Sequence, residues 1–322
     1  MAGHFYLYLH IMKGPVTCIG TAIVDELFFS RSPIIAGTSN PSQIMRFPGG
    51  VVCNVARHLG RLGLPVNIIS VLGKDGDGDW LEASLRDASV RTNGLIKVDE
   101  ATGKFAALIE PDGNLYTAAC HDLAEYYLTP ERLEEMKEDL LVSSMIIADT
   151  NLSLKTLSWL SEFSMRSRIP FVIEPVSVPK SRKIVSLPPE SVWMITPNQD
   201  ELLSLAGMKD GNEYDRALSV LQERGMERIW LRRGARGSVF YHKGEEMPLA
   251  AKPLTVVDST GAGDAALAGW VAGWHWDFSV SQSMQLGHCL AFEVLQQQGA
   301  SLPDLTKEKA LALMNQYYGQ EA

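Results

Sequence analysis

The stretch with the most chemical content lies near the C-terminus, where Thr255–Gly273 reads TVVDSTGAGDAALAGWVAG. Its residue types predict a β-branched strand, a polar turn and a helix of small residues. Gly261, Ala262 and Gly263 would leave backbone N–H groups uncovered at the helix start, where free amides and the helix dipole favour phosphate oxygens. Asp264 follows directly, although a carboxylate beside an anion site opposes anion binding. Its position therefore indicates a base that accepts a proton where a phosphate meets an incoming hydroxyl.

Other interpretations of this turn stay open. Acidic residues often stabilise the first turn of a helix, and Asp264 could do only that. Gly261, Gly263 and Ala266 also match the G-x-G-x-x-A fingerprint of a nicotinamide-dependent oxidoreductase. Against this, only about sixty residues follow the turn, too few for the remaining strands of such a half-domain. A further alternative is a catalytically silent binding protein on the same fold.

The elements that must position these residues alternate along the chain. Strand-like runs are followed by amphipathic stretches, which predicts an α/β fold with a mostly parallel sheet and helices on both faces. The strand-like runs are Val16–Ile23, Val66–Val71, Met145–Ala148, Phe171–Ile173, Trp193–Ile195 and Arg228–Leu231.

Two segments, 25–47 and 100–122, break this alternation with short strands and turn chemistry such as Pro111-Asp112-Gly113-Asn114. Neither is long enough to hold its own core, so we expect a small β lid on a single domain spanning 1–322. Residues 1–14 are expected to form an N-terminal extension, because Lys13-Gly14-Pro15 ends the first apolar run abruptly.

Composition excludes several classes of protein. Of 322 residues 46% are hydrophobic, and 29 Lys and Arg against 38 Asp and Glu give a net charge of −9, which would repel a nucleic-acid backbone. The apolar runs fall far short of the roughly 18 to 20 residues of a membrane helix. The four cysteines form no C-x-x-C pair. We expect a cytoplasmic protein with small-molecule ligands and neither nucleic-acid nor membrane partners.

Three motifs occur in a suggestive order. Pro48–Ala56 reads PGGVVCNVA, Thr196–Glu201 reads TPNQDE, and Asp258–Asp264 reads DSTGAGD. Together they resemble the glycine signature, the N-x-x-E element and the C-terminal signature of the ribokinase-like carbohydrate and nucleoside kinases, often called the PfkB family. The resemblance runs nearly end to end. It implies a three-layer α/β/α core with a mostly parallel sheet plus a small β-sheet lid, and transfer of the γ-phosphate of ATP to an alcohol group.

The resemblance also implies roles on the phosphate side. Asp264 would deprotonate the acceptor hydroxyl while the amides of residues 261–263 hold the charge of the transferring phosphoryl group. Asn198 and Glu201 would organise Mg²⁺ through water, because this ion sheds its hydration reluctantly. Locally, a helix cap by Asn198 with Glu201 in the first turn is an equally good interpretation.

Further residues match the nucleotide side of the family. Arg232, Gly234 and Gly237 resemble its nucleotide loop, where an arginine would meet ATP phosphates, and Thr260 precedes the glycines that would bind them. A basic turn on a solvated surface is the alternative for Arg232. Asp258 matches a cation ligand, which leaves K⁺ open as a further cofactor.

On the acceptor side, Asp25 matches the substrate acid of the family, while Gly49, Gly50 and Asn54 match its sugar-facing loop. A carboxylate accepts two hydroxyl hydrogen bonds, and glycines let a sugar ring approach the backbone. In isolation, Asp25 would read as a turn residue at a strand end.

Within the family the chain looks most like the pseudouridine kinases, a likeness carried in part by Asp149 and Asn151. This implies a nucleoside acceptor, phosphorylated at its 5′-hydroxyl. A sugar kinase acting on ribose, fructose or a keto-deoxy acid is the alternative, and ordinary loop polarity is the alternative for these two residues. The resemblance further implies a homodimer through the β lid, where the pairs Phe28-Phe29 and Ile34-Ile35 leave apolar surface uncovered.

Overall fold

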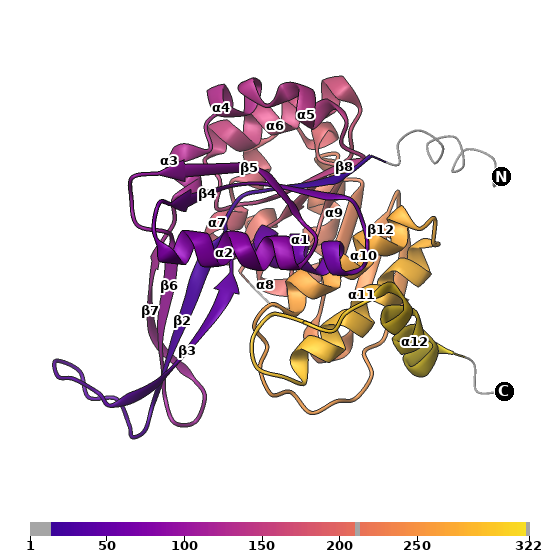
Figure 1. Cartoon of the computed structure of the whole chain (residues 1–322). Coiled ribbons are helices and arrows are strands. Elements are labelled where there is room, and N and C mark those ends of the chain that lie inside the picture. The colour runs from indigo at the N-terminus through magenta and orange to yellow at the C-terminus, as the bar shows by residue number, and fades with distance from the viewer. Residues whose placement is uncertain (1–13, 210–212, 320–322) are drawn as a thin grey trace.

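The structure is a computed structural model that describes residues 14–209 and 213–319. Apart from Gly14, the expected N-terminal extension lies outside the described residues. The described strands form two sheets, one of nine strands and one of four (Figure 1). No helix in the described ranges is long and apolar enough to cross a membrane.

The large sheet is parallel except at one edge, where β12 and β13 pair antiparallel. This confirms the predicted mostly parallel sheet. In spatial order its strands are β13 (Glu245–Leu249), β12 (Ser238–His242), β11 (Arg228–Arg232), β10 (Met194–Ile195), β9 (Phe171–Glu174), β8 (Met145–Asp149), β1 (Val16–Ile19), β4 (Val66–Gly73) and β5 (Arg91–Val98).

Helices cover both faces of this sheet, each over its own apolar core, so the molecule has three layers. One face carries α1 (Val51–Arg61), α2 (Gly76–Asp87), α10 (Ala262–His275), α11 (Val280–Leu295) and α12 (Lys307–Tyr318). The other carries α3 (Ala124–Tyr127), α4 (Pro130–Glu135), α5 (Lys137–Leu141), α6 (Leu154–Ser167), α8 (Gln199–Ala206) and α9 (Tyr214–Glu223). The remaining short helices are α7 (Val178–Ser181), η1 (Ile184–Ser186), η2 (Pro189–Ser191) and η3 (Gly234–Arg236).

The small sheet has the strand order β3-β2-β6-β7 and projects from the core at the lower left of Figure 1. Its strands are β2 (Ile23–Ser30), β3 (Ser42–Gly49), β6 (Lys104–Ile109) and β7 (Leu115–His121), which fall within or close to the two segments expected to form a lid. We call this sheet the lid. It brings Asp25 on β2 opposite Phe47 on β3 and Phe105 on β6.

Two strand predictions differ from the structure. The expected strand Val16–Ile23 ends at Ile19, because the chain crosses there from the large sheet into the lid. The expected strand at Thr255–Val257 is wrong: these residues form a loop in which Val256 and Val257 are 56% and 58% exposed. Among the described residues, one backbone bond holds this stretch, from Val257 N to Leu295 O (2.7 Å), and it pairs with none of the described strands.

Close helix packing positions the start of α10. Gly269 on α10 and Gly287 on α11 let the two backbones meet, since a Cβ on Gly269 would lie 2.7 Å from the Gly287 Cα atom. The α1 helix begins at Val51 and is preceded by Gly50 as its N-cap, whose φ of 92° suits glycine. A Cβ there would lie 2.3 Å from Thr21 O, so the turn before α1 also needs a glycine for space.

Candidate active site

Polar residues gather where the central parallel strands end. The strand β8 ends at Asp149, β9 ends at Glu174, Thr196 follows β10, and Arg232 ends β11. The carboxyl ends of parallel strands all open onto one edge of the sheet, where α/β proteins place their ligands. These side chains contact one another: Arg232 Nη2 donates to Glu174 Oε1 at 2.6 Å, and the Thr196 hydroxyl donates to Glu174 Oε2.

Asp264 lies in the first turn of α10, directly above this edge. It is 9% exposed, and its Oδ2 accepts a hydrogen bond from Asn54 Nδ2 at 2.9 Å. Burial raises the pKa of Asp264 to about 8; the Asn54 bond and Arg232 act in the opposite direction, while Glu174 and Asp149 add to the rise. A base with a pKa near the working pH is well matched to general-base chemistry.

The turn before Asp264 forms a narrow cradle. Gly261 has φ 73° and packs so tightly that a Cβ would lie 2.1 Å from Ala300 Cβ. A Cβ on Gly263 would lie 2.5 Å from Arg232 Nη1, so the guanidinium sits against the helix start. The N–H groups of Gly261 and Gly263 donate to no backbone oxygen in the described ranges, which leaves them for an anion.

The amide of Ala262 differs from expectation. Its N–H donates to Ser259 O at 3.3 Å, which closes the turn, so it is less available to an anion than its two glycine neighbours. Thr260 is exposed, and both its N–H and its hydroxyl donate to Asp258 Oδ1, at 2.9 and 2.8 Å. The other oxygen of Asp258 accepts the N–H of Gly299 at 3.0 Å. Asp258 therefore ties the cradle to the 299–301 turn.

The glycines of the predicted nucleotide loop lie in the tight turn between β11 and β12. Gly234 and Gly237 have φ of 56° and 84°, and a Cβ on Gly237 would lie 2.1 Å from Leu249 O. Arg232 is not on the solvated surface of this turn: its side chain is 16% exposed and paired with Glu174. The surface-turn interpretation of Arg232 is therefore wrong.

Asn198 and Glu201 form a capping box at the start of α8, the arrangement left open as the local alternative. Asn198 Oδ1 accepts the Glu201 N–H, and Glu201 Oε2 accepts the Asn198 N–H, both at 2.9 Å. Asn198 also bridges to Arg232, which brings the box beside the strand ends. Among the described residues no group of three or more His, Cys, Asp or Glu side chains is arranged to hold a metal ion.

Asp25, Gly49 and Asn54 line the side of the site that faces the lid. A Cβ on Gly49 would lie 2.3 Å from the Asp25 carboxyl group, so the glycine makes room for the acid. Burial raises the pKa of Asp25 to about 7. Asn54 Oδ1 is buried without a hydrogen-bond partner in the described structure, an acceptor that a ligand hydroxyl would satisfy. Asp25 and Asp264 both lie near enough to the buried Cys53 to add to the rise of its pKa, which burial dominates.

Asp149 and Asn151 fix the backbone beside these residues through hydrogen bonds. Asp149 Oδ2 accepts the Thr21 N–H at 3.1 Å, and Oδ1 accepts the Asn151 N–H at 3.0 Å. Burial raises the pKa of Asp149 to about 6, with Asp122 adding to the rise. Because both oxygens already accept backbone bonds, Asp149 acts by fixing the chain around it.

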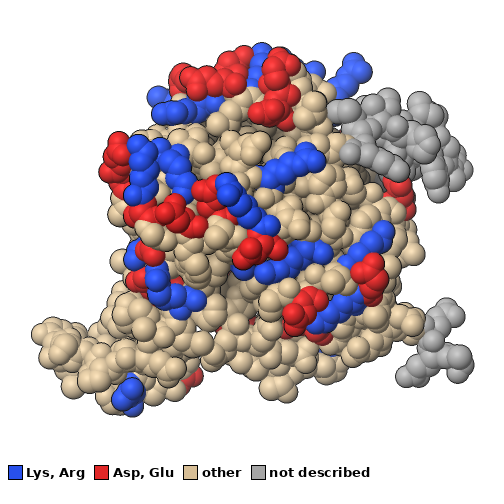
Figure 2. Space-filling view, in the orientation of Figure 1, with Lys and Arg blue, Asp and Glu red and all other residues tan. Residues whose placement is uncertain are grey.

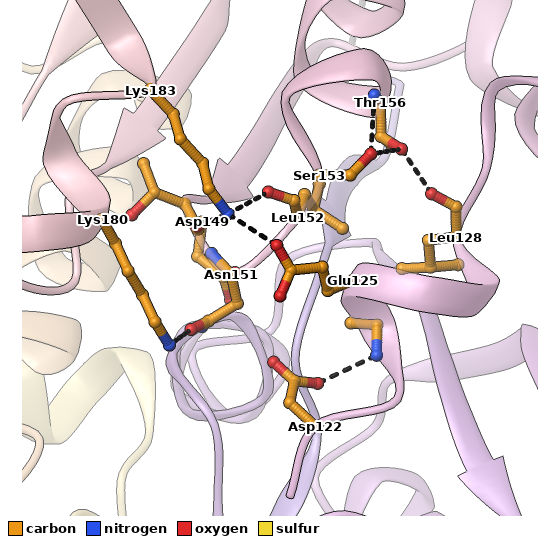
Figure 3. A network of polar contacts seen from close by, with 12 residues as sticks. Asp122, Glu125, Leu128, Asp149, Asn151, Leu152, Ser153, Thr156, Lys180 and Lys183 are labelled. Atoms are coloured by element: carbon orange, nitrogen blue, oxygen red, sulfur yellow. Dashed lines mark hydrogen bonds and ion pairs between the residues drawn. The ribbon is translucent and has the colours of Figure 1, made fainter. Parts of the chain in front are cut away.

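Three further polar residues complete the surroundings: Asp122, which belongs to the pseudouridine-kinase likeness of the sequence, and Lys180 and Arg57, which the sequence did not single out. Asp122 accepts the Thr21 hydroxyl at 2.8 Å, and Lys180 donates to Asn151 Oδ1 (Figure 3). Arg57 on α1 donates to Ser301 Oγ at 3.1 Å and contacts Pro48 O at 3.5 Å, so it links the glycine loop to the 299–301 turn. No spacing signal marks Lys180 or the contact of Arg57 with Ser301, because the partners lie more than twenty positions apart in the chain.

Solved structures share the fold of this chain, and a curated relative is similar to it in sequence. A ribokinase from Arabidopsis thaliana complexed with ribose and ATP superposes with a TM-score of 0.82 at 20% identity, covering 94% of this chain and 99% of that one. A putative ribokinase II from E. coli in complex with ATP and Mg²⁺ gives 0.81 at 18% identity, covering 94% and 100%. A pseudouridine kinase from Escherichia coli strain K12 is 27% identical over 307 residues, which are 94% of this chain and 97% of the relative.

Fold and site together define a kinase of ribokinase-like architecture. A family model described as pfkB family carbohydrate kinase matches residues 14–307, and the chain belongs to that family. The predicted resemblance is confirmed. The oxidoreductase alternative is wrong, because the glycine turn follows an irregular loop where a dinucleotide fingerprint needs a strand.

Proposed function

We propose that this kinase transfers the γ-phosphate of ATP to the 5′-hydroxyl of a nucleoside, most specifically pseudouridine. The observation that carries the proposal is the environment of Asp264: a buried carboxylate that follows an amide cradle with an adjacent guanidinium and is hydrogen-bonded to Asn54. The relatives named pseudouridine kinase support the choice of acceptor.

On the donor side, the free N–H groups of Gly261 and Gly263 and the positive end of α10 would bind phosphate oxygens. Arg232, held by Glu174, would add a fixed positive charge where negative charge grows during transfer. Mg²⁺, when bound, offsets the charge of the phosphates, and Glu201 with Asn198 would hold its water ligands. Asp258 would support a K⁺ ion beside the 299–301 turn.

On the acceptor side, the unpartnered Asn54 Oδ1 would accept a hydroxyl hydrogen bond, and Asp25 would accept others from the ribose. Asn54 also fixes the Asp264 carboxylate through its Nδ2 bond. Asp264 would then accept the proton as the acceptor oxygen bonds to phosphorus and the bond to the leaving ADP oxygen breaks. Correct placement of the oxygen contributes more here than base strength, because in a loose transition state the proton leaves late.

A sugar kinase of the same family is the second candidate, with ribose, fructose or a keto-deoxy sugar acid as acceptor, because the solved relatives include a ribokinase bound to ribose. Purified protein with ATP and Mg²⁺ should be tested against nucleosides and sugars by coupled ADP assay. Turnover of pseudouridine above all sugars supports the proposal. ADP release with a hexose or pentose alone would assign the enzyme to the second candidate.

A further inference from the structure

We propose that Lys180 contacts the part of the acceptor remote from the reacting hydroxyl and selects acceptors that carry carbonyl oxygens there. The inference rests on the proposed acceptor pocket and names the chemistry that the pocket prefers. For a nucleoside the oxygens would be those of a pyrimidine dione.

Hydrogen bonds connect Lys180 to Asn151 and Asp149, which lie beside the proposed acceptor site. Its Nζ donates to Oδ1 of Asn151, which is buried, and the Asn151 N–H donates to Asp149 Oδ1 at 3.0 Å (Figure 3). The other Asp149 oxygen accepts the N–H of Thr21, next to the crossing into the lid. Lys180 therefore reaches the pocket from α7, on a different segment from the acids of the lid.

The charge of Lys180 is not neutralised by a direct partner. Among the residues that the structure describes, it forms no ion pair with a carboxylate, and an amide oxygen is its hydrogen-bond acceptor. Lys183, three positions further along, shows the contrast. It pairs with Glu125 at 3.2 Å and donates to the carbonyl oxygens of Thr150 and Leu152 at 3.1 and 2.8 Å. Lys183 is thus satisfied by the protein, whereas Lys180 keeps donors for a ligand.

The same charge acts across the pocket on the lid. Burial raises the pKa of the Cys120 thiol on β7, the Lys180 ammonium lowers it, and Asp122 and Asp25 raise it further. Lys180, Asp122 and Asp25 therefore all lie near one point of the lid. Next to the carboxylates of Asp25 and Asp122, an ammonium without a carboxylate partner in the described ranges favours an electron-rich ligand group.

The backbone before Lys180 has an unusual geometry. Ser177 N donates to Pro175 O at 2.7 Å across Val176, whose φ is +67°. This is a γ-turn with positive φ, a rare and strained form, and it is held here by a β-branched residue. Strain of this kind persists where the surrounding structure demands it and clusters at ligand sites. The turn lies between Glu174 at the strand end and α7, and it sets the direction from which Lys180 approaches Asn151.

Lys180 would therefore favour some acceptors over others. A hydrogen bond from an ammonium to a carbonyl or carboxylate oxygen is charge-assisted and stronger than one to a neutral hydroxyl. Pseudouridine and ribose share the ribosyl group that Asp25 and Asn54 would hold, but only the nucleoside brings carbonyl oxygens. A keto-deoxy sugar acid would bring a carboxylate with the same preference. A plain pentose would gain little from Lys180.

The test compares wild type with Lys180→Met and Lys180→Arg on pseudouridine, ribose and a keto-deoxy sugar acid, using kcat/KM from a coupled ADP assay. For Lys180→Met we expect a loss of about 10- to 100-fold on pseudouridine and a change within about twofold on ribose. Lys180→Arg should recover most of the loss, since it keeps a cationic donor. The matched control Lys183→Met should lower the melting temperature and leave the ratio between acceptors unchanged.

Equal losses of Lys180→Met on all acceptors, or an unchanged ratio of pseudouridine to ribose, would overturn the inference. A failure of the proposed function looks different: wild type would then not phosphorylate pseudouridine at all. In that case the ratio of sugar acid to ribose decides the role of Lys180. A selective loss on the acid supports it, and parallel losses overturn it.

Discussion

At the scale of single residues, the environment of Asp264 sets the pH dependence of catalysis. Burial raises its pKa to about 8, and burial raises that of Asp25 to about 7. A base must be deprotonated to accept a proton, so kcat/KM for the acceptor should rise between about pH 6 and pH 8 and level off above. Initial rates across this range at constant ionic strength check the prediction. A profile that is flat down to about pH 5 would contradict it.

The same raised pKa has a consequence for stability. In the unfolded chain Asp264 would titrate near its usual value of about 4, so between about pH 4 and pH 8 folding requires it to keep a proton that the unfolded chain releases. Its contribution is therefore most favourable below about pH 4 and is lost as the pH rises. Asp264→Asn removes this cost, and we expect a higher melting temperature than wild type, with a difference that widens from pH 5 to pH 8.

Asp200 supplies the matched control for this stability experiment. It also lies in the first turn of a helix, α8, but it is exposed. Asp200→Asn loses only a favourable interaction with the helix dipole and should lower the melting temperature slightly. If Asp264→Asn behaved like Asp200→Asn, Asp264 would be a helix-stabilising residue, the alternative that its sequence position allowed.

At the scale of elements, the turn into α10 must be built from glycine. Gly261→Ala would place a methyl group 2.1 Å from Ala300 Cβ at a φ of 73°, so the turn must open and the cradle amides must move. We expect a destabilisation of about 2 kcal/mol or more and a loss of phosphoryl transfer. Thermal unfolding and the ADP assay measure the two effects.

Gly63→Ala is the control that separates the cost of a positive φ from the cost of a steric clash. Gly63 follows α1 at a φ of 81°, but a Cβ there would meet nothing within 4 Å. It should cost about 1 kcal/mol and leave activity intact. Equal effects of the two substitutions on activity would argue against a cradle at residues 261–263.

The glycine turn, the capping box and the alternation of strands and helices could be predicted because each is a local pattern. Asn198 and Glu201 lie three positions apart, and the box is the consequence of that spacing. The strand expected at Thr255–Val257 failed because β propensity does not supply a pairing neighbour. The position of Lys180 could not be predicted from the sequence, because its approach to Asn151 depends on the γ-turn at Val176. Contacts between side chains that are far apart in the chain produce no periodic pattern in the sequence.

At the scale of the whole molecule, the lid leaves an apolar row uncovered. Phe28, Ile44 and Leu108 lie opposite one another on β2, β3 and β6, and Ile44 is 50% exposed. The projecting lid in Figure 2 also shows few charged side chains on the face in view. We therefore predict a homodimer through the lid.

Light scattering with size exclusion at micromolar concentration measures this prediction. Wild type should run at about twice the chain mass of 35.4 kDa, and Ile44→Lys should shift the equilibrium toward the monomer. Exposed Met165 on α6, far from the lid in sequence, offers the control Met165→Lys, which should leave the dimer unchanged. A wild-type monomer at these concentrations would contradict the prediction.

The most direct measurement is the rate of ADP formation with ATP, Mg²⁺ and pseudouridine, compared between wild type and Asp264→Asn. The substitution keeps the shape of the side chain and its bond with Asn54 but removes the proton acceptor. We predict ADP release and a 5′-phosphorylated nucleoside with wild type, and a rate about 10²- to 10⁴-fold lower with Asp264→Asn. Undiminished turnover by the variant would contradict a base at this position, and with it the account of the site.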